Sequence, residues 1–324
     1  IYINDVPYVK ELHLNSTSCY GLFNGNTSLT KVDILTLGEN VVDCESMFYG
    51  CSNLTDIGDF KIPKNVTKCN SMFSGCNNLI IKSLSLEGLK ANCNYMFTNC
   101  EKITNLDWLN IGDSLISCSN MFSYSGLEYI SNLTIDNENV DSMFAYCKKL
   151  VSIENLIFNN AKKIGSLFSG CNKLENINGL TIEGEATNAG YLFSGCTSLT
   201  NITEMQLPNS LTSIENMFNG AGTGALQIKN LNISNITTSQ KKSFYFNQLT
   251  SLDLRFDGVI KYNIFTSDFA YKTLLTLNSL ISILNALEDR IGNTTLTLNL
   301  GSINLNKLND TQKAIALNKN WTLA

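Results

Sequence analysis

The sequence repeats itself with a period of 22–26 residues, around a phenylalanine that ten successive units share. These marker residues are Phe23, Phe48, Phe73, Phe97, Phe122, Phe144, Phe168, Phe193, Phe218 and Phe244. So narrow a spread over ten units predicts a solenoid in which each unit forms one coil. At about 4.8 Å per coil, the stack would be a rod or arc about 45–50 Å long.

The first half of each unit predicts a short strand. Eleven residues before each marker stands Leu or Ile, as at Leu37 and Leu86, and the residue two positions earlier is usually apolar too. Apolar, polar, apolar is the pattern of a strand with one buried face. The polar residues between them should stack in a strip along the outer face of a parallel sheet. These residues are Thr36, Lys61, Ser85, Asn110, Thr181, Gln206 and Asn232, and we expect Asn132 to join them.

The second half of each unit predicts a short helix. In CESMFYGC, the apolar residues Cys44, Met47, Phe48 and Cys51 follow the i, i+3, i+4, i+7 spacing of one helical face. Gly50 suits a helix end. The expected fold class is therefore an α/β solenoid, with one parallel strand and one short helix per coil.

All eleven cysteines stand in two columns, four residues before the marker or three after it. The members are Cys19, Cys44, Cys69, Cys93 and Cys118 in the first, and Cys51, Cys76, Cys100, Cys147, Cys171 and Cys196 in the second. Their spacing does not fit the paired ligands of zinc sites, and parallel Cβ vectors disfavour disulfides between coils. We expect buried free thiols that act as small core residues.

Composition excludes several function classes. The net charge of −5 comes with no basic cluster, so we expect no nucleic-acid partner. No apolar run approaches the ~20 residues of a membrane span, so we expect no membrane insertion. The first residue is Ile1, from which we expect a fragment or a processed chain.

Three features could carry chemistry, and each has a structural alternative that we favour. His13 is the single histidine of the chain, which leaves it as the one base for a nucleophilic site. GAGTGA at 220–225 lacks the Lys and Ser or Thr of a phosphate loop, and DNENVD at 136–141 lacks the central Gly of a calcium loop. The sequence therefore predicts no enzyme, no cofactor and no metal.

Two stretches, LPNSLTSIENMFNGA (207–221) and KIPKNVTKCNSMFSGCNNL (61–79), resemble the BspA-like leucine-rich repeats of bacterial surface proteins. The resemblance covers residues 1 to about 250. It implies a secreted or surface-attached binding protein rather than an enzyme.

The last residues, 296–324, resemble the closing segment of leucine-rich repeat proteins encoded by phages and prophages of Gram-positive bacteria. We expect residues 1–254 to form the solenoid, with about ten coils. We expect 255–324 to form a C-terminal capping segment of strand, helix, strand and short helix, with one helix over 278–291 and another over 309–320.

The sequence thus predicts an extracellular recognition or adhesion module that binds a cell-surface protein or glycan of a bacterial or host cell. Our first hypothesis is that the module belongs to the tail tip of a phage or tailocin, where it would form a trimer through a region before Ile1. The alternatives are a BspA-like bacterial adhesin and a purely structural spacer or lattice subunit. The polar strip is the candidate ligand platform, and Trp321 or Tyr271 would anchor a ligand if the C-terminal segment binds instead.

Overall fold

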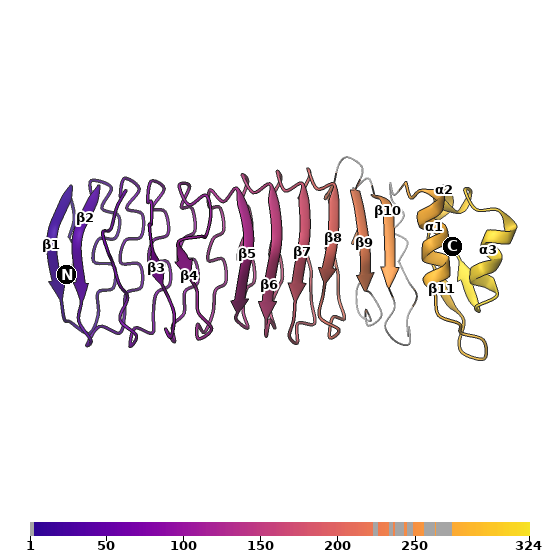
Figure 1. The fold of residues 1–324 in the computed structure, drawn as a ribbon, viewed down its shortest axis with the longest axis horizontal. Coiled ribbons are helices and arrows are strands. Elements are labelled where there is room, and N and C mark those ends of the chain that lie inside the picture. Colours follow the sequence, from indigo (N-terminus) through magenta and orange to yellow (C-terminus); the bar gives the residue numbers. More distant parts are fainter. Residues whose placement is uncertain are drawn as a thin grey trace.

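The computed structural model is an elongated solenoid whose strands lie side by side along the rod (Figure 1). It describes residues 3–222, 226–232, 236, 243–244, 249–255, 263 and 274–324. The strands along the rod are β1 (Tyr8–Leu14), β2 (Lys31–Leu37), β3 (Leu84–Ser85), β4 (Leu109–Asn110), β5 (Tyr129–Asp136), β6 (Ser152–Asn159), β7 (Asn176–Ile182), β8 (Asn201–Gln206), β9 (Leu226–Asn232) and β10 (Leu249–Arg255). All pairings between neighbouring strands are parallel, as the repeat predicts.

The ten marker phenylalanines form one buried column through the core. Every one of them is fully or almost fully buried. Successive rings are stacked, with centroids between 5.1 Å (Phe23 to Phe48) and 5.7 Å (Phe122 to Phe144) apart. The repeat interpretation is therefore confirmed at its central residue.

The predicted helix in each coil is wrong, because the marker segment consists of two successive tight turns. The amide of Met47 bonds to the carbonyl oxygen of Cys44 at 3.3 Å, and the amide of Cys51 bonds to that of Phe48 at 3.1 Å. The third residue of each turn, Ser46 and Gly50, has a positive φ of 56° and 69°. This combination is typical of type II turns.

The backbone between these turns bonds to the next coil instead of to its own helix. The amide of Phe48 donates to the carbonyl oxygen of Met72 at 2.8 Å, and that of Gly50 donates to Ser74 at 2.7 Å. Two turns in succession place four apolar side chains inside at the spacing of a helical face. Within the described residues, α-helix is confined to the C-terminal segment.

The expected register is wrong in several coils. Asn132 does not stand in the strip, since Thr134 aligns with Ile157 of β6, which in turn aligns with Thr181 of β7. Asn132 instead has a positive φ of 50° and kinks β5, as Asn155 (φ 49°) kinks β6. In the first coil Leu12 pairs with Leu35 rather than with Leu37. The strand-to-marker distance therefore varies between coils.

The C-terminal segment lies at one end of the rod (Figure 1). Its elements are α1 (Leu277–Ala286), β11 (Leu296–Leu298), α2 (Gly301–Leu305), α3 (Asp310–Leu317) and β12 (Trp321–Leu323), of which α2 and β12 were not predicted. Helix α1 lies against β10, where the Ser279 hydroxyl bonds to both the amide and the carbonyl oxygen of Leu252 at 2.7 and 2.8 Å. Helix α3 begins with a capping box between Asn309 and Gln312.

None of the helices in the described part is long and apolar enough to span a membrane.

Candidate ligand-binding trough

Most strip residues stand on parallel strands, on the outer face of the sheet, whereas Lys61 lies in the coil between β2 and β3, which has no strand. Ser85 pairs with Asn110, and Thr181 pairs with Gln206. Thr36 aligns with His13 of β1, whose imidazole lies 2.8 Å from the Glu11 carboxylate on the exposed surface. At the other end, Asn232 aligns with Arg255 of β10. Thr36, Lys61, Ser85, Asn110 and Gln206 are exposed, whereas Thr181 and Asn232 are half-buried.

Four hollows follow one another along the first half of this strip, and each shares lining residues with the next; together we call them the trough. Their volumes are about 610, 380, 430 and 420 Å³. In this order along the rod, the first and second hollows share Lys61 and Lys64 as lining residues. The second and third share Glu87, and the third and fourth share Asp113 and Asp136. The strip residues that line the trough are Thr36, Lys61, Ser85 and Asn110, joined by Thr134.

The charge of the trough changes along its length. The end near Lys61 and Lys64 also holds carboxylates, whereas from Glu87 onward most charged side chains are acidic. The acidic part is partly neutralised by the ion pair of Lys162 with Glu138 at 2.6 Å. A ligand lying in the trough would therefore meet a graded field rather than a uniform one.

Amide side chains tie the acidic residues of the trough to neighbouring coils. The Nδ2 of Asn110 donates to the Glu87 carboxylate at 3.1 Å, and that of Asn160 donates to Asp136 at 2.7 Å. Gly112 allows the backbones to approach, since a Cβ at this position (φ +69°) would lie 2.7 Å from the Cα of Glu87. The lining residues are thus positioned by the backbone and by one another.

Within Asp136–Asp141, at the acidic end, the chain leaves β5 and turns over residues 137–139, which agrees with the turn favoured from the sequence. The amide of Asn139 bonds to the Asn137 side chain at 3.0 Å, and Asn137 donates to the carbonyl oxygen of Leu115 at 2.6 Å. Burial raises the pKa of Asp141, although the amide of Gly165 donates to its carboxylate at 2.7 Å. No group of three His, Cys, Asp or Glu residues in the described part could hold a metal ion.

The cysteines are buried free thiols, as predicted. In the second column the thiol donates to the carbonyl oxygen of the marker phenylalanine in the preceding coil, as from Cys51 to Phe23 and from Cys76 to Phe48, both at 3.0 Å. Burial raises the pKa of Cys51 and of Cys196 to about 12. Thiols that are buried and protonated are poor nucleophiles and poor metal ligands.

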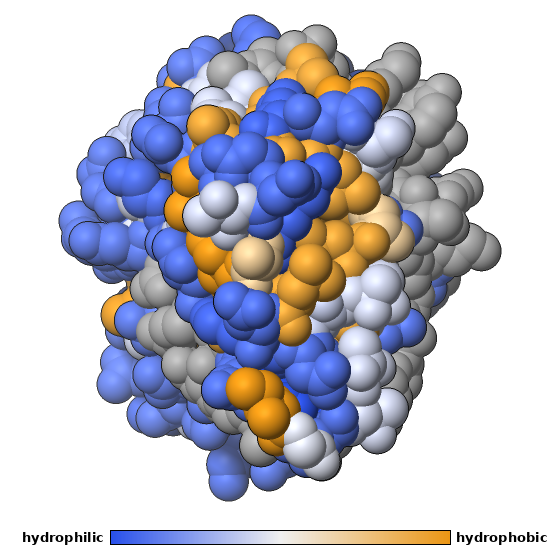
Figure 2. All heavy atoms as spheres, turned by 90° about the vertical axis from the view of Figure 1, so that its right-hand side faces the viewer, coloured by the Kyte–Doolittle hydropathy of each residue, from blue (hydrophilic) through white to orange (hydrophobic). Residues whose placement is uncertain are grey.

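The C-terminal end is the rival binding surface. Figure 2 looks onto this end and shows apolar surface gathered near its centre, with polar residues around it. Among the described residues of the C-terminal segment, the exposed large apolar side chains are Leu274, Leu277, Ile291, Ile303 and Leu317. Trp321, which we expected to anchor a ligand, cannot do so because it is 1% exposed and donates its indole N–H to the carbonyl oxygen of Glu288 at 3.1 Å. Tyr271 lies outside the described residues.

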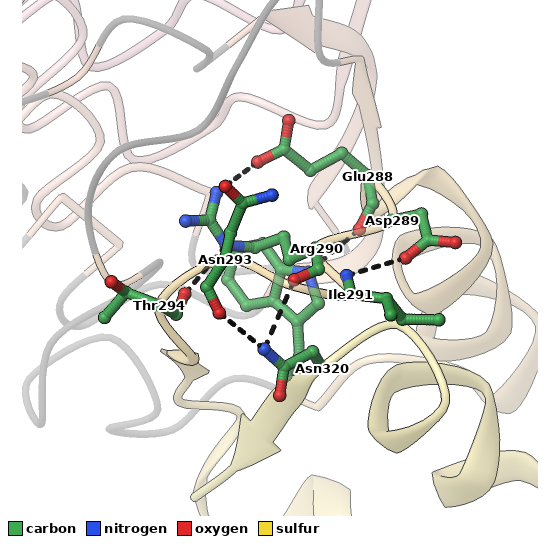
Figure 3. Close-up of polar contacts among 8 residues, drawn as sticks. Glu288, Asp289, Arg290, Ile291, Asn293, Thr294 and Asn320 are labelled. Carbon is green, nitrogen blue, oxygen red and sulfur yellow. Dashed lines mark hydrogen bonds and ion pairs between the residues drawn. The ribbon is translucent and has the colours of Figure 1, made fainter.

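A braced loop stands between β11 and α1 at this end (Figure 3). The buried Arg290 pairs with Glu288 and lies 5.8 Å from the ring centroid of Trp321. Asn320 donates to the carbonyl oxygens of Arg290 and Asn293, at 3.2 and 2.8 Å. These contacts fix the loop that carries Ile291, which at 69% has the largest exposed fraction among the large apolar residues that the structure describes.

Sequence reasoning missed the acidic lining of the trough. Glu87 and Asp136 each follow a strip position by two residues, which places them on the same face of an extended chain. That spacing was available as a signal, but only the correct register shows that they gather in one hollow. The other two sequence candidates add nothing to the site: His13 lies outside the trough, and GAGTGA is described only as far as Gly222.

Comparison with known proteins places the chain in a family. The model of the BspA type leucine rich repeat region matches residues 18–151, 94–183 and 167–290, with six copies. No curated protein matches the chain.

Among solved structures, the chain is similar to a leucine-rich repeat protein from Bacteroides ovatus ATCC 8483, with 20% identity and a TM-score of 0.41. The match covers 89% of this chain and 63% of that protein. The family match spans most of the chain and agrees with the repeat and the parallel solenoid, so the chain belongs to the BspA type leucine-rich repeat family.

Proposed function

We propose that the chain is a non-enzymatic recognition or adhesion module that works outside the cell and binds a cell-surface component in the trough. The succession of hollows along the sheet carries this proposal, because adjoining hollows on several coils offer an extended ligand contacts on each of them. Its lining of hydroxyl, amide and charged groups suits a glycan or the polar edge of a protein. BspA type repeats also suggest adhesion or recognition in general.

The carrier that we consider first is the tail tip of a phage or tailocin, on the resemblance of residues 296–324 to phage-encoded relatives. A surface adhesin of a bacterium is the alternative, since BspA type proteins are generally surface-associated. In both carriers we propose that residues 255–324 cap the solenoid, which fits the contact of α1 with β10. A cap would block the open edge of the sheet against pairing with other chains.

A spacer or lattice subunit is the second function that we consider. The continuous stack of marker rings favours it, since such a core makes the coils one stiff unit. A spacer does not need a ligand-binding surface. If the chain is a spacer, substitutions in the trough should not change its binding to cells.

The test is a triple variant in the trough, Lys61→Glu with Ser85→Trp and Asn110→Trp, measured for binding to a panel of Gram-positive bacteria by flow cytometry. We expect binding at least tenfold weaker and an unchanged melting temperature. The matched control changes Thr181 and Gln206 to Trp, on the same strip but outside the four hollows. Equal loss in both variants would show a general surface effect, and no loss in either would reject the trough.

A further inference from the structure

The turn wall is the face that the marker segments build across the core from the sheet. We define it by the positions three and two residues before each marker and one and two residues after it, from Tyr20 to Gly220. Tyr, Ser, Gly and Asn fill all of these positions except Glu45, Thr98, Asp141, Ala145 and Glu215. None holds Lys or Arg. Tyr, Ser, Gly and Asn are also the residues that dominate antibody binding loops, where Tyr gives rigid contact area and the others adaptable hydrogen bonds.

Six tyrosines protrude from this wall, each between 41 and 48% exposed. They are Tyr20, Tyr49, Tyr95, Tyr124, Tyr146 and Tyr191. Within the described part of the chain, none of their hydroxyls forms a hydrogen bond to the protein. The presence of tyrosine at these positions is therefore explained neither by an ion pair nor by a hydrogen bond within the protein.

Four of the six stand where the turns demand a left-handed backbone. Tyr95, Tyr124, Tyr146 and Tyr191 have φ values of 58° or 59°. In the other coils the same positions hold Gly, Ser or Asn. A tyrosine is unfavourable there, because its Cβ crowds the backbone. The amides of these tyrosines bond to the next coil, which holds the backbone in this conformation. Residues held in such conformations cluster at active and ligand-binding sites.

Small neighbours leave the tyrosine rings open to a ligand. Tyr191 stands between Ser166 and Asn216 in the adjacent coils, and Tyr95 stands between Ser71 and Asn120. Beside Ser or Asn, a ring retains a face that a flat partner can cover. The exception is the pair Tyr124 and Tyr146, whose rings stack on each other with centroids 4.7 Å apart.

The chemistry of the wall selects an uncharged, hydroxyl-rich partner. It offers no cation, and its three carboxylates belong to Glu45, Asp141 and Glu215. The apolar C–H face of a sugar ring can pack on the electron-rich face of a tyrosine, while Ser and Asn groups bond to its hydroxyls. Protein interfaces also favour Tyr, but their cores add Trp, Met, Phe or Arg, and the wall exposes none of these four.

From these observations we propose that the turn wall binds a neutral polysaccharide lying along the rod. The site goes beyond the trough of the proposed function, since it lies on the opposite side of the core. Its ligand class follows from the exposed tyrosines, the Ser and Asn residues beside them and the lack of Lys and Arg.

The test is affinity electrophoresis in gels that contain hydroxyethylcellulose, yeast mannan or dextran, with polygalacturonate as the anionic comparison. We expect at least one neutral polymer to retard the protein and the anionic one to leave it unretarded. The variant changes Tyr95, Tyr124 and Tyr191 to Asn, which tolerates the left-handed backbone and occurs at the same positions in other coils. Retardation should then fall at least tenfold in apparent affinity.

Two comparisons make the outcome decisive. Tyr→Phe at the same three positions keeps the rings and should retain part of the affinity, and the Lys61, Ser85 and Asn110 variant should bind as the wild type does. The proposal is overturned if no neutral polymer retards the wild type, or if the Asn variant remains folded and binds equally well. Loss in the trough variant alone would place glycan binding in the trough and not on the turn wall.

Discussion

The thiol of Cys76 donates a hydrogen bond of 3.0 Å to the carbonyl oxygen of Phe48 in the preceding coil. The same bond recurs from Cys100 to Phe73 and from Cys171 to Phe144, each at 3.1 Å. It distinguishes the two cysteine columns. In the first column the other coils hold mainly aliphatic residues, such as Val140 and Ile164, whereas in the second they hold Asn26, Ser125, Ala221 and Asn247.

Exchanging Cys76 for Ala should therefore lower the free energy of unfolding by ~1–2 kcal/mol, through lost packing and a lost donor. Cys44→Val is the matched control in the first column and should cost less, because that column accepts aliphatic residues. Urea unfolding of both variants checks this. Equal losses would mean that the thiol bond adds nothing to packing.

The buried thiols also predict a loss of stability in alkali. In the unfolded chain a thiol ionises near pH 9, whereas in the folded chain burial raises the pKa of Cys51 and Cys118 to about 12. Between these values the folded state binds more protons, so stability is full below pH 9 and falls as the pH rises toward 12. Each such thiol should contribute about 1.4 kcal/mol per pH unit.

Urea unfolding at pH 8 and pH 10.5 measures this slope. A variant in which Cys44, Cys69 and Cys118, whose pKa values are raised in the folded chain, are changed to Val should show a smaller decline than the wild type. A decline of the same size in both proteins would assign the alkaline loss to other groups.

The contact between Ser279 and Leu252 predicts that α1 protects β10, the last described strand of the six-stranded sheet. Ser279→Ala removes the partner of both backbone groups of Leu252 and should cost ~1–3 kcal/mol. Hydrogen exchange should quicken at Leu252 and remain slow at Leu156 in β6. Unchanged exchange at Leu252 would show that α1 does not stabilise β10, and the proposed cap would lose its support.

Left-handed tyrosines should be replaceable without loss of stability. Tyr191→Asn keeps a residue that tolerates positive φ, so the melting temperature should not fall. Asn216 holds the equivalent position in the next coil, with a positive φ of 54°, and so shows that Asn is compatible with this backbone. Thermal unfolding followed by circular dichroism provides the check, and a clear drop would mean that the ring itself stabilises the wall.

Much of the fold was predictable, because the marker spacing alone places Phe73 and its equivalents in one column and the strands beside one another. The helix was not, since two type II turns bury Cys44, Met47, Phe48 and Cys51 at the same spacing as a helix. Gly50 and Gly75 indicated a left-handed residue after the marker. The left-handed residue before the marker could not be predicted, because Ser46, Ser71 and Tyr95 are not residue types that indicate a positive φ.

The candidate site was predictable only in part. Alternation within the strands placed Ser85 and Asn110 on the outer face, and the structure pairs them. The trough depends on where repeats shorten and the register shifts, as when Thr134 takes the place that we assigned to Asn132. Such shifts follow from backbone kinks that non-glycine residues adopt, so composition gives little warning of them.

Carboxyl footprinting of the protein bound to intact target cells tests the central claim most directly. If the trough holds the ligand, labelling of Glu87, Asp113 and Asp136 should fall several-fold on binding, while Asp289 and Asp310 at the C-terminal end keep their labelling. Protection of Asp289 and Asp310 with Glu87, Asp113 and Asp136 still labelled would contradict the account and place recognition at the end of the rod.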